Sequence, residues 1–259
     1  MLGAIAGDII GSVYEKQPVK TTDFPLFLPE SRFTDDTVLT VAIADSLLHD
    51  RPFAENVRKY ARAYPLAGYG GSFMRWMSGL NEGPYHSWGN GAAMRVSPVG
   101  FAFEELETVK QVARETAIIT HDHPEGVKGA QAVAAAVYLA RSGYGKALIK
   151  DHIERHYAYD LSRTLADIRP MYCFEVSCQG SVPQSIRAFL ESTSWESAVR
   201  NAISLGGDAD TMACIVGAIA EAFYGGVPVE IEAEVIRRLP ADFQQTIDLF
   251  YEAFPWEEG

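Results

Sequence analysis

Apolar residues recur every three or four positions along most of the chain, which is the spacing of one face of an α-helix. Glycine- and proline-rich stretches at 16–31, 68–72, 79–92 and 169–183 are expected to be loops. The period-two alternation of strands is scarce, so we predict an all-α fold, a compact multi-helix bundle. The apolar pattern predicts helices over residues 2–13, 35–48, 54–64, 106–119, 126–141, 209–224, 229–238 and 241–253, and a capping box at Thr193-x-x-Glu196 predicts one more, through Leu205.

Small residues form a stripe on the first predicted helix. Gly3, Gly7 and Gly11 lie four positions apart, so they share one face and would let another backbone approach closely. The run Gly3-Ala4-Ile5-Ala6 recurs as Gly217-Ala218-Ile219-Ala220. Two helices with such faces could pack together and bring both ends of the sequence into one core. A four-residue repeat in a chain rich in these residues is also expected by chance.

The composition is that of a globular chain with a sizeable core. The sequence has 259 residues, of which 47% are hydrophobic and 22% charged. No Gly-, Ser- or Pro-rich linker divides it, so we expect one domain over residues 1–259. No segment reaches the roughly 18 apolar residues of a membrane span, so a membrane is not an expected partner.

The charge and the cysteine content limit which binding partners and which cellular compartment are expected. The net charge of −12 opposes binding of a phosphate backbone, so nucleic acid is a disfavoured partner, whereas clustered carboxylates bind hard cations. Cys173, Cys178 and Cys214 form no C-x-x-C pair, which argues against a disulfide framework or a zinc ribbon. The first residues lack the basic start of a signal peptide, and Asp8 interrupts their apolar run. We therefore expect a cytoplasmic protein.

Two segments place paired carboxylates and a threonine directly before apolar helices. They are Thr34-Asp35-Asp36-Thr37 and, after two glycines, Asp208-Ala209-Asp210-Thr211. Oxygen-only ligands suit Mg²⁺, Mn²⁺ or Ca²⁺ and disfavour zinc. Asp and Thr are also ordinary helix caps, which is the alternative interpretation of either segment alone. Four acids brought together would repel one another, and a cation is the usual reason for a fold to tolerate that. Glu15 could supply a further carboxylate.

Two further segments carry candidate substrate contacts. Trp88-Gly89-Asn90-Gly91-Ala92-Ala93-Met94-Arg95 is a glycine-rich entry to a predicted helix. Free backbone N–H groups there can bind a diphosphate, although the same composition also suits a plain turn. His121 and His123 flank Asp122 just before another predicted helix, where a histidine is either a polar cap or a ligand contact.

Together these segments resemble the ADP-ribosylglycohydrolase family. The resemblance spans residues 3–211, and the joint occurrence of its motifs in family order is specific although each motif alone is common. Its motifs are Gly3-Ala4-Ile5-Ala6-Gly7-Asp8 with Gly11-Ser12, Phe33-Thr34-Asp35-Asp36-Thr37, Asn90-Gly91-Ala92-Ala93-Met94-Arg95, Thr120-His121 with His123-Pro124-Glu125, and Gly206-Gly207-Asp208-Ala209-Asp210-Thr211.

The resemblance implies a compact orthogonal helical bundle whose cleft holds two Mg²⁺ ions, with Mn²⁺ as the other candidate. By that similarity, the metal ligands are Thr34, Asp35, Asp36, Asp208, Asp210 and Thr211. The implied substrate contacts are Asn90, Gly91, Ala92, Ala93 and one of the two histidines, for which we favour His123. Hydrolysis also needs a carboxylate beside the ions to take a proton from water, and the candidates are Asp36, Asp210 and Glu15, with the choice among them open. The implied partner is ADP-ribose or an ADP-ribosylated protein, and the implied state is a monomer.

The implied reaction is hydrolysis of the glycosidic bond between ADP-ribose and an acceptor such as a protein arginine, releasing ADP-ribose. Two alternatives stay open. A metal-dependent phosphohydrolase, using His121, Asp122 and the acidic pairs, would release phosphate or a nucleotide instead. A non-catalytic ADP-ribose-binding or structural protein on the same scaffold would be expected to lack metal ligands, and all the motif acids are present here.

Overall fold

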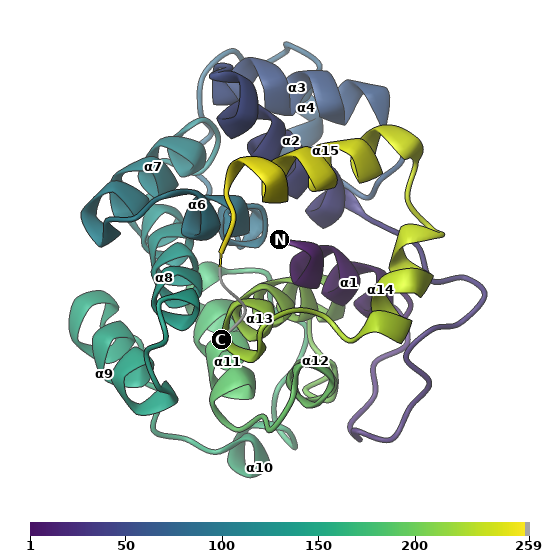
Figure 1. Cartoon of the computed structure of the whole chain (residues 1–259), viewed down its shortest axis with the longest axis vertical. Coiled ribbons are helices and arrows are strands. Elements are labelled where there is room, and N and C mark those ends of the chain that lie inside the picture. Colours follow the sequence, from purple (N-terminus) through teal and green to yellow (C-terminus); the bar gives the residue numbers. More distant parts are fainter. Residues whose placement is uncertain (257–259) are drawn as a thin grey trace.

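The computed structural model describes residues 1–256 as a set of helices joined by loops (Figure 1). These residues contain no β-strand, which confirms the all-α prediction; an isolated antiparallel bridge joins Gly89 to Ser177. None of the described helices combines the length and apolar character needed to cross a bilayer. The helices are α1 (Leu2–Gly11), α2 (Asp35–His49), α3 (Phe53–Ala63), α4 (Gly71–Met77), α5 (Gly91–Met94), α6 (Ser97–Ala102), α7 (Leu106–Ile118), α8 (Pro124–Arg141), α9 (Lys146–Tyr157), α10 (Leu165–Ile168), α11 (Cys178–Leu190), α12 (Trp195–Ile203), α13 (Ala209–Tyr224), α14 (Val229–Ile236) and α15 (Ala241–Ala253).

Helices α1 and α13 lie side by side near the middle of the molecule (Figure 1). Their backbones touch: a Cβ atom on Gly7 would lie 2.0 Å from the carbonyl oxygen of Ala213, and one on Gly3 would lie 2.3 Å from that of Gly217. Only glycine permits this approach, since such distances leave no room for a methyl group. The predicted packing of the two small-residue faces is therefore confirmed.

Polar groups fix the start of α1 against the same partner. The Met1 amino group donates to Glu221 Oε1 at 2.9 Å and to the Tyr251 hydroxyl at 2.8 Å. The backbone N–H of Gly3 donates to Glu221 Oε2 at 2.7 Å. Because Glu221 is on α13 and Tyr251 is on α15, this buried network joins three helices from opposite ends of the sequence.

The other helices pack around this central pair. Helix α2 adjoins α1, α3 and α15, while α8 packs between α7 and α13. Helices α11 and α12 pack against α13 and against each other. Both ends of the sequence therefore contribute to one core. The two acidic segments form the N-termini of α2 and α13.

Two sequence predictions need correction. The loop expected over 169–183 ends early, because α11 begins at Cys178 after the side chain of Ser177 caps it. Gly180 and Pro183 disguise this helix, although its buried residues Cys178, Val182, Ile186 and Phe189 keep helical spacing. The capping box before α12 is formed by Ser194 and Ser197, not by Thr193 and Glu196, so that prediction was wrong by one residue.

Replacing Gly7 with alanine should destabilise the fold, because the new methyl group would meet backbone rather than a movable side chain. We expect the free energy of unfolding to fall by about 3 kcal/mol. The measurement is the denaturant midpoint at unchanged slope. Gly83→Ala is the control: no atom lies within 4 Å of that Cβ position, and the change should stay within about 0.5 kcal/mol. Equal stability of the two variants would contradict the close packing of α1 and α13.

Candidate metal centre

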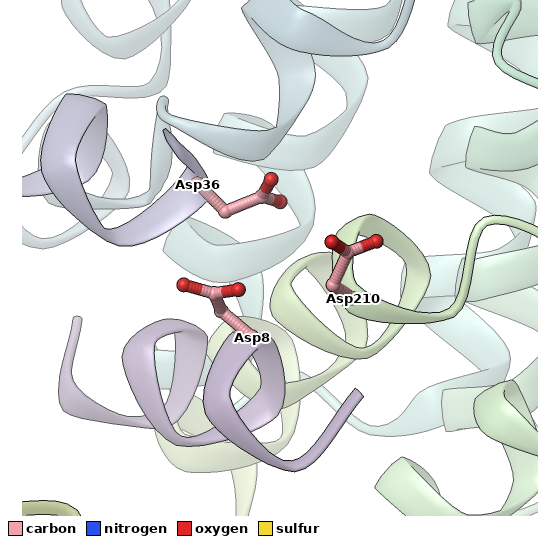
Figure 2. Close-up of side chains that lie close together, drawn as sticks. All are labelled: Asp8, Asp36 and Asp210. Carbon is pink, nitrogen blue, oxygen red and sulfur yellow. The ribbon is translucent and has the colours of Figure 1, made fainter. Parts of the chain in front are cut away.

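Three aspartates from three helices meet at the junction of α1, α2 and α13 (Figure 2). Asp8, Asp36 and Asp210 each offer a carboxylate oxygen, and these oxygens all lie within 4.8 Å of one another. All three residues are buried. The two acidic segments, 34–37 and 208–211, are therefore brought together in space, and Asp8 joins them.

Asp8 anchors the start of α2. Its Oδ1 accepts a hydrogen bond from the Thr34 hydroxyl at 2.6 Å, and its Oδ2 accepts from the backbone N–H groups of Thr34 at 2.9 Å and Thr37 at 3.1 Å, and from the Thr37 hydroxyl. These bonds occupy most of its acceptor sites, so its main task is to position the residues around it. Sequence analysis placed Asp8 in a family motif but did not select it as a site residue; a carboxylate inside an apolar helix was the available signal.

Asp36 is buried, and its carboxylate is only partly hydrogen-bonded. Its Oδ2 accepts a weak hydrogen bond from the Thr211 hydroxyl at 3.3 Å, which links α2 to α13. Its Oδ1 is buried and has no hydrogen-bond partner within residues 1–256. A buried, unpartnered carboxylate oxygen costs free energy unless a cation or a donor occupies the adjacent space.

Asp208 is held in place by the loop that precedes α5. It is the N-cap residue of α13, and the loop before it turns at Gly206, which has a φ of 65°. The side-chain amide of Asn90 donates to Asp208 Oδ2 at 2.8 Å. The backbone N–H of Asn90 donates to the carbonyl oxygen of Val176 at 2.8 Å. Asn90 therefore joins the glycine-rich loop to the acidic segment and to the loop before α11.

The carboxylates have no amino-acid cation to neutralise them. No Lys, Arg or His of residues 1–256 forms an ion pair with Asp8, Asp35, Asp36, Asp208 or Asp210. Burial raises the pKa of Asp8 to about 6. Burial, with the charge of Asp8, raises the pKa of Asp35 to about 7. Burial also raises the pKa values of Asp36 and Asp210 well above the usual range, and neighbouring carboxylates add to both shifts.

These features fit a divalent cation. The donor set consists of carboxylate and hydroxyl oxygens, one buried oxygen lacks a partner, and the negative charge has no counter-ion among the described residues. Hard cations such as Mg²⁺ prefer such ligands, and a bound cation would restore the carboxylates to their ionised form.

The cluster opens into a cavity of about 730 Å³. The cavity walls come from the loops after α1, before α4, before α5 and before α11. Among the predicted metal ligands, substrate contacts and proton acceptors, those that line the cavity are Glu15, Thr34, Asp35, Asp36, Asn90, Gly91, Asp208, Asp210 and Thr211. Asp35 is the first residue of α2, and its backbone N–H is held by the carbonyl oxygen of Ala67 at 3.0 Å.

The remaining candidate contacts lie elsewhere. Ala92 and Ala93 are fully buried in α5 and do not line the cavity. His123 caps α8, where its Nδ1 accepts from the backbone N–H of Glu125 at 3.1 Å, and it too lies outside the lining. His121 does line the cavity: its Nε2 would lie 3.2 Å from a Cβ on Gly91.

Comparisons with known proteins point to one family. The family model described as ADP-ribosylglycohydrolase matches residues 1–258. An ADP-ribosylhydrolase ARH3 from Mus musculus is 27% identical over 97% of this chain and 87% of the relative. The ARH3 of Homo sapiens is 28% identical over 87% of this chain and 84% of the relative. An uncharacterized protein of Archaeoglobus fulgidus is 26% identical over 88% of this chain and 87% of the relative.

A solved structure has the same fold. The protein titled "ADP-ribosylglycohydrolase-related protein complex" superposes with a TM-score of 0.72 at 24% identity, over 97% of this chain and 96% of that chain. Length differs from the animal relatives: the alignment with the mouse protein runs over 332 positions against the 259 residues of this chain, so that relative carries segments with no counterpart here.

The metal-free protein should lose stability as the pH rises from about 4 to about 7. The native carboxyls titrate above the unfolded value of 3.8, Asp35 at about 7, so the native state holds more protons across this window. Their contribution is complete below the unfolded pKa and is lost as the pH rises through the folded pKa. Chemical unfolding at several pH values measures this.

The variant Asp36→Asn isolates the effect. It removes one of the mutually repelling carboxylates, so without metal it should gain stability over the wild type as the pH rises. Saturating Mg²⁺ at pH 7.5 should raise the unfolding temperature of the wild type by mass action and have much less effect on the variant. A wild type that is indifferent to Mg²⁺ would count against a cation at this site.

Proposed function

Because the chain belongs to the ADP-ribosylglycohydrolase family, we propose that it is an ADP-ribosylhydrolase that cleaves the bond between ADP-ribose and its acceptor. The observation that carries this proposal is the unneutralised carboxylate cluster, with its unpartnered Asp36 oxygen, at the base of a cavity of about 730 Å³. A cavity of that size lies in the range that holds ligands with several ring systems. We further propose a cytoplasmic, single-domain monomer that acts on ADP-ribosylated protein.

The proposed cofactor is a pair of Mg²⁺ ions, with Mn²⁺ as the other candidate. Bound there, the ions would bind the vicinal ribose hydroxyls and polarise a water molecule. This assignment is supported because both acidic segments line the same cavity. Asp8, which does not line it, holds the segment at 34–37 in place through hydrogen bonds. The proposed ligands are Thr34, Asp35, Asp36, Asp208, Asp210 and Thr211.

The protein's own residues supply the rest of the chemistry. Cleavage at the ribose C1 atom builds oxocarbenium character, and an attacking water must give up a proton. Asp36, Asp210 and Glu15 are the proposed acceptors of that proton. Glu15 is the least constrained of them, because it lines the cavity and its side chain makes no hydrogen bond within residues 1–256, whereas Asp36 and Asp210 are also proposed metal ligands.

The glycine-rich loop is the proposed binding site for the diphosphate and ribose. Gly89, Asn90 and Gly91 line the cavity in the loop that enters α5. The backbone N–H groups of Gly89 and Asn90 donate to Ser87 Oγ and to the carbonyl oxygen of Val176, so the N–H of Gly91 is the group proposed to meet a phosphate oxygen. His121 lies against this loop, so it is the better placed of the two histidines for a substrate contact.

The acceptor is proposed to be a protein side chain such as arginine. Glu15 and Glu30 both line the cavity, and carboxylates can pair with the guanidinium group of a departing arginine. Because the mouse relative has segments that this chain lacks, an acceptor preference of such relatives cannot simply be transferred. A serine-linked substrate is therefore the necessary comparison.

The geometry gives little support to a phosphohydrolase. Asp122 faces the exposed His86, with Oδ1 3.5 Å from its Nδ1, and does not line the cavity. The neighbouring His121 is bonded to Thr120 through its Nδ1. Of this pair only His121 reaches the cavity, so the His-Asp pair does not join the acidic cluster as a phosphohydrolase site would require. A purely structural role is disfavoured because the proposed ligands are all retained and share one cavity.

Incubation with arginine-linked and serine-linked ADP-ribosyl peptides, with and without Mg²⁺, tests the proposed function. We expect Mg²⁺-dependent release of intact ADP-ribose from the arginine-linked peptide, measured by chromatography with mass detection. Asp210→Asn should lower kcat by about 100-fold or more, since even outer-shell changes at metal sites cost 10–100-fold.

Asp122→Asn is the matched control, because it removes a carboxylate outside the cavity and should leave the rate within about twofold of the wild type. Release of phosphate or a nucleotide, with a rate that depends on Asp122, would support the phosphohydrolase instead. Preference for the serine-linked peptide would keep the reaction class and overturn the proposed acceptor.

A further inference from the structure

Arg95 is a buried cation without a carboxylate partner. It follows α5 and is fully inaccessible to solvent, and it forms no ion pair within residues 1–256. Its Nη2 donates to the carbonyl oxygen of Thr116 at 2.9 Å and to the Thr120 hydroxyl at 2.8 Å. Thr116 lies in the last turn of α7, where the unpaired carbonyl oxygens carry partial negative charge. The end of this helix therefore holds the guanidinium against Thr120.

Thr120 in turn contacts the imidazole of His121. The Thr120 Oγ1 atom lies 2.7 Å from His121 Nδ1, and both residues are buried. An arginine can only donate, so Thr120 Oγ1 accepts from Arg95 and keeps its single proton for another acceptor. Among the hydrogen bonds of residues 1–256, His121 Nδ1 is the acceptor available to that proton. The hydroxyl therefore donates to Nδ1, and the ring proton must be on Nε2.

The opposite tautomer would bond this cluster less well. With a proton on Nδ1, Thr120 Oγ1 would receive donors from both Arg95 and His121, and its own proton would have to turn from an imidazole nitrogen to the nearby Tyr85 hydroxyl, a weaker acceptor. The charge of Arg95 also works against a second positive group nearby. Burial first, and then Arg95, lower the pKa of His121 well below its usual value, so the ring stays uncharged.

We propose that Arg95 and Thr120 act as positioning residues that lock His121 as a neutral donor, with its Nε2–H directed at the cleft beside Gly91. His121 Nε2 would lie 3.2 Å from a Cβ on Gly91 and 3.6 Å from one on Gly89, so these glycines leave the donor uncovered. The cavity reaches both His121 and Arg95. Such a donor recognises an oxygen acceptor, either a sugar hydroxyl or a phosphate oxygen.

This inference rests on the proposed function only for the identity of the ligand whose oxygen accepts the Nε2–H hydrogen bond. If ADP-ribose occupies the cavity, a fixed Nε2–H donor adds a hydrogen bond whose direction is set before the ligand arrives. Loss of the Thr120 hydroxyl would let the ring adopt the other tautomer and present a lone pair to the same oxygen. Repulsion would then replace attraction at this position, without any change in the carboxylate cluster.

The test compares Thr120→Val, which removes the hydroxyl and keeps the shape, with Thr120→Ser, which keeps the hydroxyl. Thr116→Val is the matched control, because its hydroxyl bonds the carbonyl oxygen of Ala113 and the backbone oxygen used by Arg95 is retained. The two readouts are the ¹⁵N resonances of the imidazole at pH 7, assigned with His121→Asn, and the Kd for ADP-ribose by calorimetry in the presence of Mg²⁺.

We expect His121 to be protonated at Nε2 and unprotonated at Nδ1 in the wild type and in the variants Thr120→Ser and Thr116→Val. Thr120→Val should show mixed tautomers and bind ADP-ribose about tenfold more weakly, or about 1.4 kcal/mol. A wild-type ring protonated at Nδ1, or an unchanged tautomer in a folded Thr120→Val, would overturn the inference. A Thr120-dependent tautomer in a protein that does not bind ADP-ribose would uphold the positioning role and refute the proposed function instead.

Discussion

The backbone contact between α1 and α13 is the constraint on which the rest of the structure depends. Gly3 and Gly7 bring α1 against α13, and a Cβ on Gly11 would lie 2.5 Å from the Cα atom of Asp210. Two carboxylates, one from each end of the sequence, are therefore set at a fixed separation by packing rather than by any loop. A side chain larger than hydrogen in this stripe would force the helices apart and move Asp8 away from Asp210. The packing of the hydrophobic core therefore determines the geometry of the acidic centre.

The same constraint creates an electrostatic problem that the chain does not solve with its own cations. Asp8 is stabilised by the hydroxyls and N–H groups of Thr34 and Thr37, but Asp36 keeps a buried oxygen with no partner among the described residues. Raised pKa values are the protein's response when nothing else neutralises the charge. A divalent ion bound between these carboxylates would neutralise that charge. If the centre acts as proposed, stability and function oppose each other here, as is usual where charged groups are assembled for chemistry.

Much of the fold follows from the sequence because helical periodicity is a local signal. The packing of the two small-residue faces was also foreseeable, since Gly3 has its counterpart in Gly217. The start of α11 was missed because Gly180 and Pro183 mimic a loop. In the site, spacing selects the acidic segments, but it cannot show that Asp8 supports them from behind. Nor can it show which of two histidines, separated by one residue, faces the cavity. Those are questions of side-chain direction, which tertiary contacts decide.

The hydrogen bond from Asn90 to Asp208 has a thermodynamic consequence. Asn90 belongs to the loop proposed to hold the substrate, while Asp208 belongs to the segment proposed to hold the ions. If the proposed ions bind, they would change the charge that the amide of Asn90 meets, and the loop's affinity for its ligand would change with it. Linkage is reciprocal, so the ligand must change ion affinity by the same factor. The affinities for the ions and for the substrate would therefore be coupled in both directions, so that occupancy of either site is read out at the other.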